Sequence, residues 1–488
     1  MDTRRRSLLR WPNKNAHLLS ILQNIIGIGN IATFFIGFVN GGGIVMLIPL
    51  FIFTFTIGIP VMYMELLIGQ AFRKGSLEVW NELCPFLKGI GYSYILHSVI
   101  TNMYYLALSG HILNWFISTL SYPNIYSNIN DSLNSSIIIP LSNRTDFIGL
   151  NPEYLASFLL AVIINYACIQ NGALSISRMA NFFFIYCNLA VFVLIVKSIS
   201  SPQSFIGINE TFAIDWKQLM KPDTWIDAVT IITFSGSLGS GLLINFSSYA
   251  GDYPVNLKTF SAVVLIFDLL YGILCSLQVS ASRNTIIIAK SHSSSLNIIQ
   301  YMPVFYQSMN NGWIYAVIYN LNVLILSITT VFTDIEQIHI ALTYKFWCFK
   351  HYVRLSRFLL VTAIGCLSSI CLTKYGNTII NYFLLYGAKY TTFLIIALES
   401  AAICYSYSFK KFYVKVNQEE REKPGKLMLF AWAIFVPIVY ISMFVASFAT
   451  FKSNDFRMVV FEYVLTIIVL SPIPIYMIFY HIFNFIKR

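Results

Sequence analysis

Charged residues are scarce in this chain of 488 residues. They make up 11% of the sequence, whereas hydrophobic residues make up 57%, and a soluble globular protein carries about 25% charged residues. Several apolar stretches, among them LMLFAWAIFVPIVYISMFVASFA, exceed the roughly 20 residues that a helix needs to cross a bilayer. This composition excludes a soluble domain of any size. It predicts an all-α polytopic membrane protein that has the lipid bilayer as a partner.

Sequence signals of enzymatic chemistry are also missing. The seven histidines are scattered without metal-ligand spacing, and the chain contains neither a phosphate-binding loop nor a nucleophile motif. Nearly all of the eight cysteines fall in apolar stretches or on the predicted cytoplasmic side, so we interpret them as thiols of the core. We therefore expect that the protein is not an enzyme.

The apolar stretches predict about twelve transmembrane helices. Their approximate limits are 17–37, 41–69, 89–120, 153–171, 178–200, 225–251, 258–283, 313–343, 355–373, 376–407, 427–450 and 457–486. Because the number of spans is even, both termini are expected on the same side of the membrane.

Positive charge accumulates in alternate loops, although the chain is poor in charge overall. The net charge of +11 comes from Lys and Arg that cluster near residues 4–14, 73–88, 345–357 and 410–426. The positive-inside rule places these loops in the cytoplasm. The charge therefore gives no reason to expect a nucleic-acid partner. We predict a multi-pass protein of the plasma membrane with both termini in the cytoplasm.

One predicted external loop, residues 121–150, differs from the rest. It is rich in Ser and Asn and carries N-x-Ser/Thr sequons at Asn130, Asn134 and Asn143. Such sequons are acceptors for N-linked glycans on external loops. We therefore expect a glycoprotein.

Two predicted spans contain glycines and polar residues where an unbroken helix is not expected. The first span holds NIIGIGN at residues 24–30, and the sixth holds FSGSLGSG at residues 234–241. Glycine weakens a helix by about 1 kcal/mol, and irregular backbone at membrane depth is tolerated where it lines a site. Freed carbonyls could bind a cation, and the N-terminus of the resumed helix an anion. The alternative is that the glycines serve close helix packing.

The two interrupted spans lie five spans apart, so they run in opposite directions through the membrane. This offset predicts an inverted five-helix repeat with broken helices one and six. The predicted organisation is an N-terminal cytoplasmic segment 1–16, a first repeat 17–200, a second repeat 225–407 and two further spans in 427–486.

The sequence resembles the neurotransmitter:sodium symporter family over most of its length. The resemblance is strongest in WPNKNAHLLSILQNIIGIGN, in NGGGIVMLIPLFIFTFTIGIPVMYMELLIGQAFRKG and in CPFLKGIGY, and INFSSY and LILSITTVFTDIE extend it. It implies a secondary symporter that couples uptake of a small solute to Na⁺ by alternating access.

The resemblance implies two sodium sites, made of the oxygen ligands that hard cations prefer. The second site would use the carbonyls of Gln23, Ile26 and Leu326 and the hydroxyls of Thr329 and Thr330. The first site would use the Ile25 carbonyl, Asn30, Ser235 and a residue of span seven. That last position is Phe267 or, with a shift of one residue, Asp268. We favour Asp268, because an acid inside a span indicates function.

The resemblance also implies a solute pocket. Its residues would be Gly27, Gly29, Thr101, Tyr105, Phe234, Ser237, Ser240 and Thr330. Amine carriers of the family have Asp at the position of Gly27, so an amino acid is favoured over a monoamine. Asp334, one helical turn after Thr330, would lie beside the bound side chain. It would select a cationic solute, carry a proton, or serve structure.

Several positions depart from the family pattern. Thr33 and either Leu384 or Leu385 replace the charged pair of the outer gate, so we expect an apolar gate of Tyr105 and Phe234. Leu50 and Ile231 replace chloride ligands, which makes chloride dependence doubtful, and Asp268 would supply negative charge instead. The alternatives to a sodium symporter are a non-transporting family member and a proton-coupled carrier.

Overall fold

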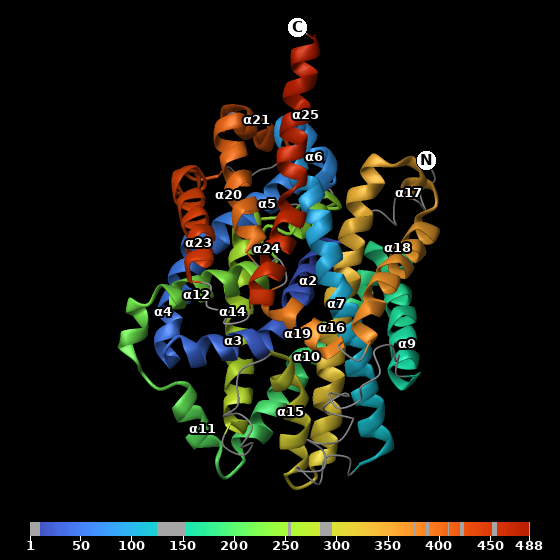
Figure 1. Cartoon of the computed structure of the whole chain (residues 1–488), viewed down its shortest axis with the longest axis vertical. Helices are drawn as coiled ribbons and strands as arrows, with labels where there is room; N and C mark the ends of the chain where they lie inside the picture. Colours follow the sequence, from blue (N-terminus) through green and yellow to red (C-terminus); the bar gives the residue numbers. More distant parts are fainter. Residues whose placement is uncertain are drawn as a thin grey trace.

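Helices joined by short loops make up the part of the chain that the structure describes. The computed structural model describes residues 10–123, 152–251, 255–283, 295–373, 376–386, 390–407, 409–419, 424–450 and 456–487, and no strand occurs among them. The helices run mostly along the long axis of the molecule (Figure 1). The predicted all-α class is therefore confirmed. The sequons at Asn130, Asn134 and Asn143 lie outside the described residues.

Each of the first five predicted spans is filled by one helix or by consecutive helical segments. The elements of this half are α2 (Lys14–Ile25), α3 (Ile28–Asn40), η1 (Gly43–Met46), α4 (Leu47–Phe53), η2 (Thr54–Gly58), α5 (Ile59–Phe72), α6 (Ser76–Leu83), η3 (Pro85–Leu87), α7 (Gly89–Ser121), α9 (Pro152–Ile169) and α10 (Ala173–Ile199). Asn13 caps α2, because its side chain accepts a hydrogen bond of 2.8 Å from the amide of Ala16.

In the second half of the chain, the predicted spans are likewise filled by single helices or by consecutive helical segments. Its elements before span eight are α11 (Ser204–Thr211), η4 (Trp216–Met220), α12 (Pro222–Ser235), α13 (Leu242–Ser248), α14 (Leu257–Ser282) and α15 (Ser295–Gln307). From span eight onward they are α16 (Gly312–Lys345), α17 (Trp347–His351), α18 (Val353–Ser368), η6 (Ser369–Leu372), α19 (Gly376–Tyr386), α20 (Thr391–Ala401), η7 (Ala402–Ser406), α21 (Phe409–Glu419), α22 (Lys426–Phe430), η8 (Ala431–Phe435), α23 (Val436–Thr450), α24 (Phe456–Leu470) and α25 (Pro472–Lys487).

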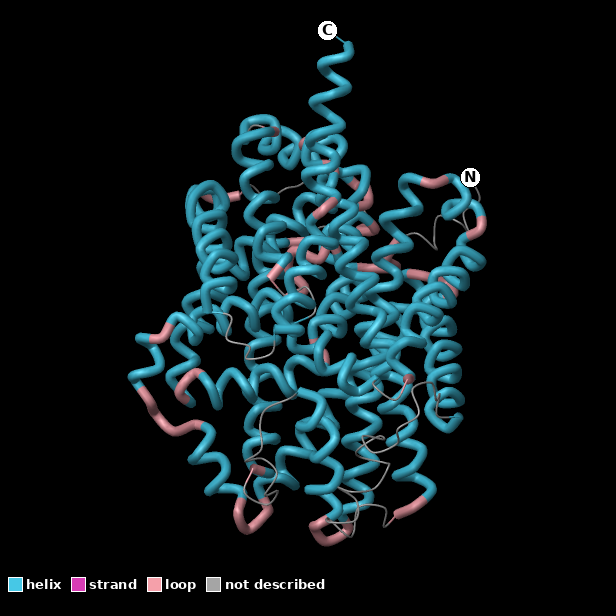
Figure 2. The backbone as a smooth tube through the Cα atoms, viewed as in Figure 1, coloured by secondary structure: helices cyan, strands magenta, loops and turns pink. Residues whose placement is uncertain are grey.

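Both predicted helix breaks are present. Helices α2 and α3 are separated by Ile26 and Gly27 and bend by 49°. Helices α12 and α13 are separated by residues 236–241, where Ser237, Gly239 and Gly241 have positive φ angles of 52°, 67° and 81°. Loop segments consequently occur within the bundle as well as at its ends (Figure 2). Helix α3 packs on α12 and α2 on α13, which is the pairing expected of two broken helices that run antiparallel.

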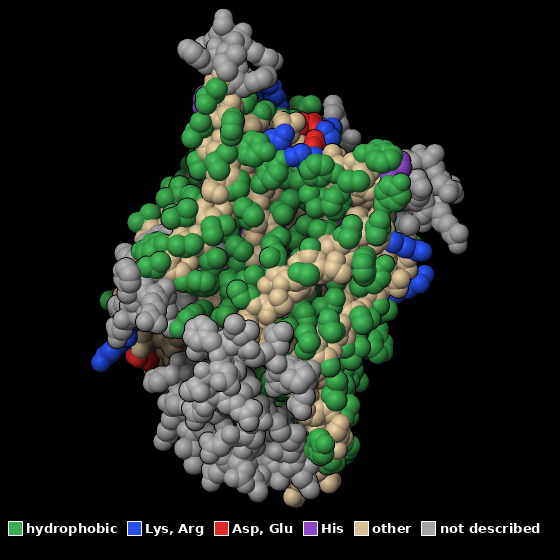
Figure 3. Space-filling model, turned by 45° about the vertical axis from the view of Figure 1, so that its right-hand side comes forward, with side chains coloured by type: hydrophobic (Ala, Val, Ile, Leu, Met, Phe, Trp, Pro, Cys, Tyr) green, Lys and Arg blue, Asp and Glu red, His purple; other side chains and the backbone are tan. Residues whose placement is uncertain are grey.

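The surface of the bundle fits a membrane. By length and hydropathy, seven described helices could each span a bilayer, or up to nine when bent pairs are counted as one span. On α10, more than half of each side chain is exposed at Phe182, Ile185, Leu189, Phe192 and Val196, which share one helix face. On the face shown in Figure 3, hydrophobic side chains cover most of the middle of the molecule, and one group of Lys and Arg lies near the upper end.

The two ends of the bundle differ in the segments that they carry. Helices α6, α17, α21 and α25 lie at the upper end in Figure 1, and α11 and α15 lie at the lower end. The predicted basic clusters near 73–88, 345–357 and 410–426 include or adjoin α6, α17 and α21. The described residues of these three clusters therefore lie toward the same end of the molecule. The predicted limits of the two repeats remain a prediction.

Candidate functional site

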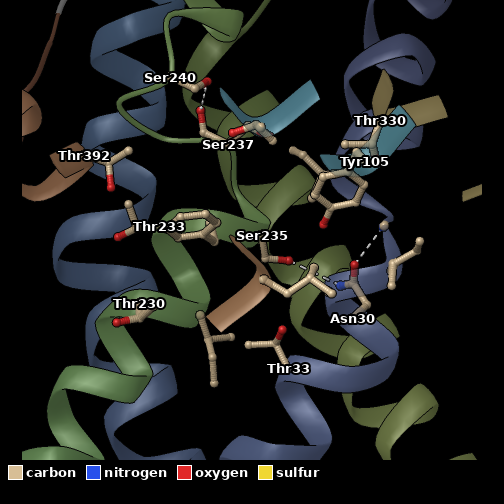
Figure 4. A pocket seen from close by; sticks show the side chains of 18 of the residues that line it. Asn30, Thr33, Tyr105, Thr230, Thr233, Ser235, Ser237, Ser240, Thr330 and Thr392 are labelled. Atoms are coloured by element: carbon tan, nitrogen blue, oxygen red, sulfur yellow. Dashed lines mark hydrogen bonds between the residues drawn. The ribbon is translucent and has the colours of Figure 1, made fainter. Parts of the chain in front are cut away.

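A cavity of about 210 Å³ lies where the two broken helices meet, and α7, α16, α19 and α20 complete its wall. It is smaller than the roughly 300–1,000 Å³ typical of sites for drug-sized ligands, so its size suits a small solute. All nine residues predicted for the solute pocket line this cavity: Gly27, Gly29, Thr101, Tyr105, Phe234, Ser237, Ser240, Thr330 and Asp334. Figure 4 shows side chains from several of these helices converging on it, with the hydroxyl of Tyr105 directed inward.

The break in the first span presents backbone groups to this cavity. The amide of Gly27 donates a 2.8 Å hydrogen bond to the side-chain oxygen of Asn30, and the amide of Asn30 donates to the carbonyl of Gly27 at 3.2 Å. The remaining first amides of α3, at Ile28 and Gly29, have no acceptor within the helix. They carry the partial positive charge of a helix N-terminus. This end of the cavity is therefore suited to a carboxylate.

The break in the sixth span is stabilised by side chains from other helices. The amide of Gly239 donates to Glu65 Oε1 of α5 at 2.7 Å. The side-chain amide of Asn24 donates to Ser237 Oγ at 3.0 Å, and Ser240 Oγ donates to the carbonyl of Ser237 at 2.7 Å. Polar groups freed by unwinding are costly in an apolar interior unless they are paired. These bonds therefore explain how the break persists at this depth.

Asn30, Ser235 and Asp268, predicted for the first sodium site, come together in the structure. Asn30 Nδ2 donates to Ser235 Oγ at 3.3 Å (Figure 4). Asn30 Nδ2 also donates to Asp268 Oδ1 at 2.6 Å, and Ser235 Oγ donates to Asp268 Oδ1 at 2.5 Å. Ile25 lines the neighbouring cavity. The alternative residue, Phe267, packs its ring against Phe184 and so lies among aromatic side chains. Of the two positions in span seven, Asp268 is the one in contact with Asn30 and Ser235.

The residues predicted for the second sodium site lie on α2, on α16 and in the first break, and α2 packs against α16. Thr329 Oγ1 donates to the carbonyl of Ile325 at 2.7 Å, and Thr330 Oγ1 donates to that of Leu326 at 3.1 Å. Each hydroxyl thus donates its hydrogen bond within its own helix, and the lone pairs of its oxygen remain available to accept a hydrogen bond or bind a cation. Gln23 and Ile26 are buried on the facing segment. A role of these groups in binding sodium stays a prediction.

Two glycines of the first break leave room that a side chain would occupy. A Cβ atom on Gly27 would lie 3.6 Å from Thr330 Oγ1, and one on Gly29 would lie 3.9 Å from Thr33 Oγ1. Both are ordinary contact distances. The glycines of the sixth break are different, because a Cβ on Gly241 would approach the ring of Tyr94 to 2.7 Å. The two breaks therefore need glycine for different reasons.

Sequence reasoning missed part of the cavity wall. His97 and Ser98 of α7, Asn24 of α2 and Thr392 of α20 also line it. Asn24 accepts a hydrogen bond from Thr333, and the ring of His97 lies 6.2 Å from that of Phe234. A polar residue within an apolar stretch was the available signal for Asn24. The helical spacing of His97 from Thr101 and Tyr105 was the signal for His97.

The two sides of the first break differ in their contacts. On the α2 side, Trp11 is bound to α13 and its end: Trp11 Nε1 donates to the carbonyl of Phe246 at 2.7 Å, and its amide donates to that of Tyr249 at 3.0 Å. On the α3 side, the lining continues to Thr33, Ile36 and Thr230. The cavity lining thus extends along α3 and α12, on the side of the break away from the Trp11 contacts.

The departures from the family pattern are visible in the structure. Thr33 and Leu384 both line the cavity, so the described wall has no ion pair at the predicted outer gate. Tyr105 and Phe234 line it as well. The side chain of Leu385 lies outside the described residues. Leu50 and Ile231, which stand where chloride ligands were expected, are buried apolar side chains.

Known proteins that are similar to this chain are transporters by their names. The chain matches the model described as "Sodium:neurotransmitter symporter family" over residues 9–149 and 138–484. It is 22% identical to the sodium-dependent dopamine transporter of Caenorhabditis elegans, over 92% of this chain and 82% of that protein. It is 25% identical to the sodium- and chloride-dependent GABA transporter 2 of Rattus norvegicus, over 90% and 79%. It is 24% identical to the sodium-dependent serotonin transporter of Drosophila melanogaster, over 91% and 76%.

Proposed function

The chain belongs to the sodium:neurotransmitter symporter family, and from this premise we propose that it is a sodium-coupled symporter of an amino acid or a related zwitterionic solute. The bound solute and the driving cation would share the two helix breaks. Solute and sodium would cross together as the cavity opens first to one side of the membrane and then to the other.

One observation carries the proposal. Asn30 bonds the amide of Gly27 through its oxygen and Asp268 through its nitrogen, so a single side chain links the solute cavity to the predicted first sodium site. A cation held by Asn30, Ser235 and Asp268 would fix the orientation of Asn30. That orientation would in turn fix the first turn of α3, whose amides face the solute. Binding of either species would therefore favour binding of the other.

The preference for an amino acid rests on Gly27. The dopamine and serotonin transporters named above act on amines by their names, whereas the break of this chain offers free amides and no carboxylate at position 27. Such a helix end attracts the carboxylate of an amino acid. An ammonium group at the same place would be repelled by the partial positive charge at the N-terminus of α3.

Weak or absent chloride dependence is part of the same proposal. The GABA transporter of the comparison is chloride-dependent by its name, but Leu50 and Ile231 carry no group that could bind an anion. Asp268 is 3% exposed and bonded to the predicted sodium ligands. Its fixed negative charge would take the place of a bound anion beside the cation.

The orientation that we propose follows from charge. The end with the basic clusters would face the cytoplasm, together with both termini, and the end with α11 would face outward at the plasma membrane. The cavity extends toward the α11 end. The structure would then correspond to an outward-facing state.

Uptake and current in Xenopus oocytes test the proposal. Radiolabelled amino acids should accumulate with an inward current that disappears when N-methyl-D-glucamine replaces Na⁺, and replacement of chloride by gluconate should leave most of both signals. Uptake that is independent of Na⁺ but depends on pH would establish a proton-coupled carrier instead. Absence of any solute-dependent flux, with the protein at the surface, would establish a non-transporting member. A large loss in gluconate would refute the role of Asp268 as the substitute for chloride.

A further inference from the structure

Asp334 is a charged side chain in the cavity wall that the proposed sodium sites do not use. It lies on α16, one helical turn after Thr330, and it is partly exposed to the cavity that both residues line. No ion pair of Asp334 occurs among the described residues. A carboxylate at membrane depth is costly without a partner, and acids at such positions face a cavity or a functional site.

The described wall offers Asp334 no Lys or Arg, and its one histidine, His97, packs its ring against that of Phe234. Asp334 is the one acidic residue of the described lining. The acid of the predicted sodium site, Asp268, is already bonded to Asn30 and Ser235. The same wall includes hydroxyls and aromatic rings, among them those of Thr101, Tyr104 and Tyr105. The partner that would balance this charge is therefore expected to enter with the solute.

The distance along α16 matches a solute with two separated charges. Thr330 Oγ1 lies 3.6 Å from the place where Gly27 would carry a Cβ, so Thr330 marks the end of the cavity where the free amides of α3 begin. Four residues along an α-helix correspond to a rise of about 6 Å. A side chain of three or four methylene groups, as in arginine or lysine, covers such a span. The α-carboxylate would occupy one end and the terminal cation the other.

We propose that the transported solute is an amino acid with a cationic side chain, and that Asp334 binds that side chain. This inference rests on the proposed function, because it assigns the side-chain end of the same site. The α-carboxylate would meet the amides of α3, and the guanidinium or ammonium group would meet the carboxylate of Asp334. The hydroxyl of Thr101, one turn from Tyr105 on α7, would be available as an additional acceptor.

A pair of isosteric solutes tests this proposal. Arginine and citrulline have almost the same shape but differ in charge, so we expect Na⁺-dependent uptake of arginine and lysine by the native chain, with citrulline at least tenfold poorer in apparent affinity. Loss of a hydrogen bond to a charged group lowers affinity by about tenfold to a hundredfold. Asp334→Asn should remove that preference, mainly through KM for arginine. Asp223→Asn, at an exposed Asp at the start of α12, is the matched control.

The charge carried per solute gives a second readout. At fixed voltage, the ratio of current to radiolabel flux should be larger by one elementary charge for arginine than for a neutral amino acid carried by the Asp334→Asn protein. Na⁺-dependent uptake of neutral amino acids alone by the native chain would overturn the inference and leave the proposed function standing. Na⁺-dependent uptake of a monoamine without a carboxylate would overturn this inference and also the amino-acid preference in the proposed function, and only the sodium coupling would remain. Absence of all Na⁺-dependent uptake would overturn both.

Discussion

Asp268→Asn is the change that isolates the charge at the first sodium site from its geometry. Asp268 Oδ1 accepts hydrogen bonds from Asn30 Nδ2 at 2.6 Å and from Ser235 Oγ at 2.5 Å. The side-chain oxygen of an asparagine can accept both of these bonds. The arrangement of the three side chains should therefore persist, while the negative charge beside the predicted cation is lost.

The magnitude follows from Coulomb's law. For charge centres about 4 Å apart, as in a close ion pair, and an effective dielectric constant of about 20, one unit charge changes the interaction with a bound cation by ~4 kcal/mol. Loss of the desolvation cost of the carboxylate offsets part of this. We therefore expect the apparent Na⁺ affinity for solute-evoked current to fall about tenfold to a hundredfold. We also expect replacement of external chloride by gluconate to have no additional effect, because Leu50 and Ile231 remain unable to bind an anion.

The assay is the Na⁺ dependence of current in oocytes, with surface biotinylation to normalise for expression. Asp223→Asn controls for the loss of an acid far from the site. An unchanged Na⁺ dependence in Asp268→Asn, at normal surface level, would refute the assignment of Asp268 to the cation site. A fall in maximal current at constant Na⁺ affinity would likewise contradict it, because the charge would then act on a later step.

Two further substitutions test other parts of the site. Gly241→Ala should destabilise the detergent-solubilised protein by about 2–4 kcal/mol, because φ is 81° and the new Cβ would lie 2.7 Å from the Tyr94 ring. Gly425→Ala is the control, because a Cβ added there would meet no atom within 4 Å. Equal melting temperatures of the two variants would disprove the steric requirement at Gly241. Thr330→Val should lower the apparent Na⁺ affinity about tenfold or more. Thr362→Val is the control, because it removes an exposed hydroxyl that is bonded to its own helix in the same way, and it should leave the Na⁺ affinity unchanged. Identical Na⁺ dependence of the two variants would show that Thr330 does not bind sodium.

The sequence predicted the parts of the fold that depend on local composition. Glycine and polar residues in the middle of apolar stretches indicated both breaks, and the structure has them at Gly27 and at residues 236–241. An acid in a span likewise indicated Asp268. Contacts between distant segments were not predictable in this way. The bond from the amide of Gly239 to Glu65 joins residues 174 positions apart, and nothing in the sequence near Glu65 specifies that partner.

His97 shows the same limit within one helix. A histidine in an apolar span is compatible with a satisfied core side chain, and only the rotation of α7 decides which face meets the cavity. Thr101 and Tyr105 were assigned from the family resemblance, and His97 lies one helical turn before Thr101, on the same face. That register could have identified it, because all three line the cavity.

The glycines themselves discriminate between helix packing and a binding site as the reason for the two breaks. At the sixth span, packing and backbone conformation are sufficient, since Gly239 and Gly241 have positive φ and a Cβ at either would approach a neighbouring side chain to 2.7 Å. At the first span, packing and backbone conformation do not explain the glycines, because Gly27 and Gly29 have negative or extended backbone angles and could carry a Cβ at ordinary contact distance. A side chain at Gly27 would occupy the space beside the first amides of α3 and the hydroxyl of Thr330. The first break therefore keeps volume and amide donors free in the cavity, where under the proposed function a solute would bind, and the sixth break would supply the wall opposite it.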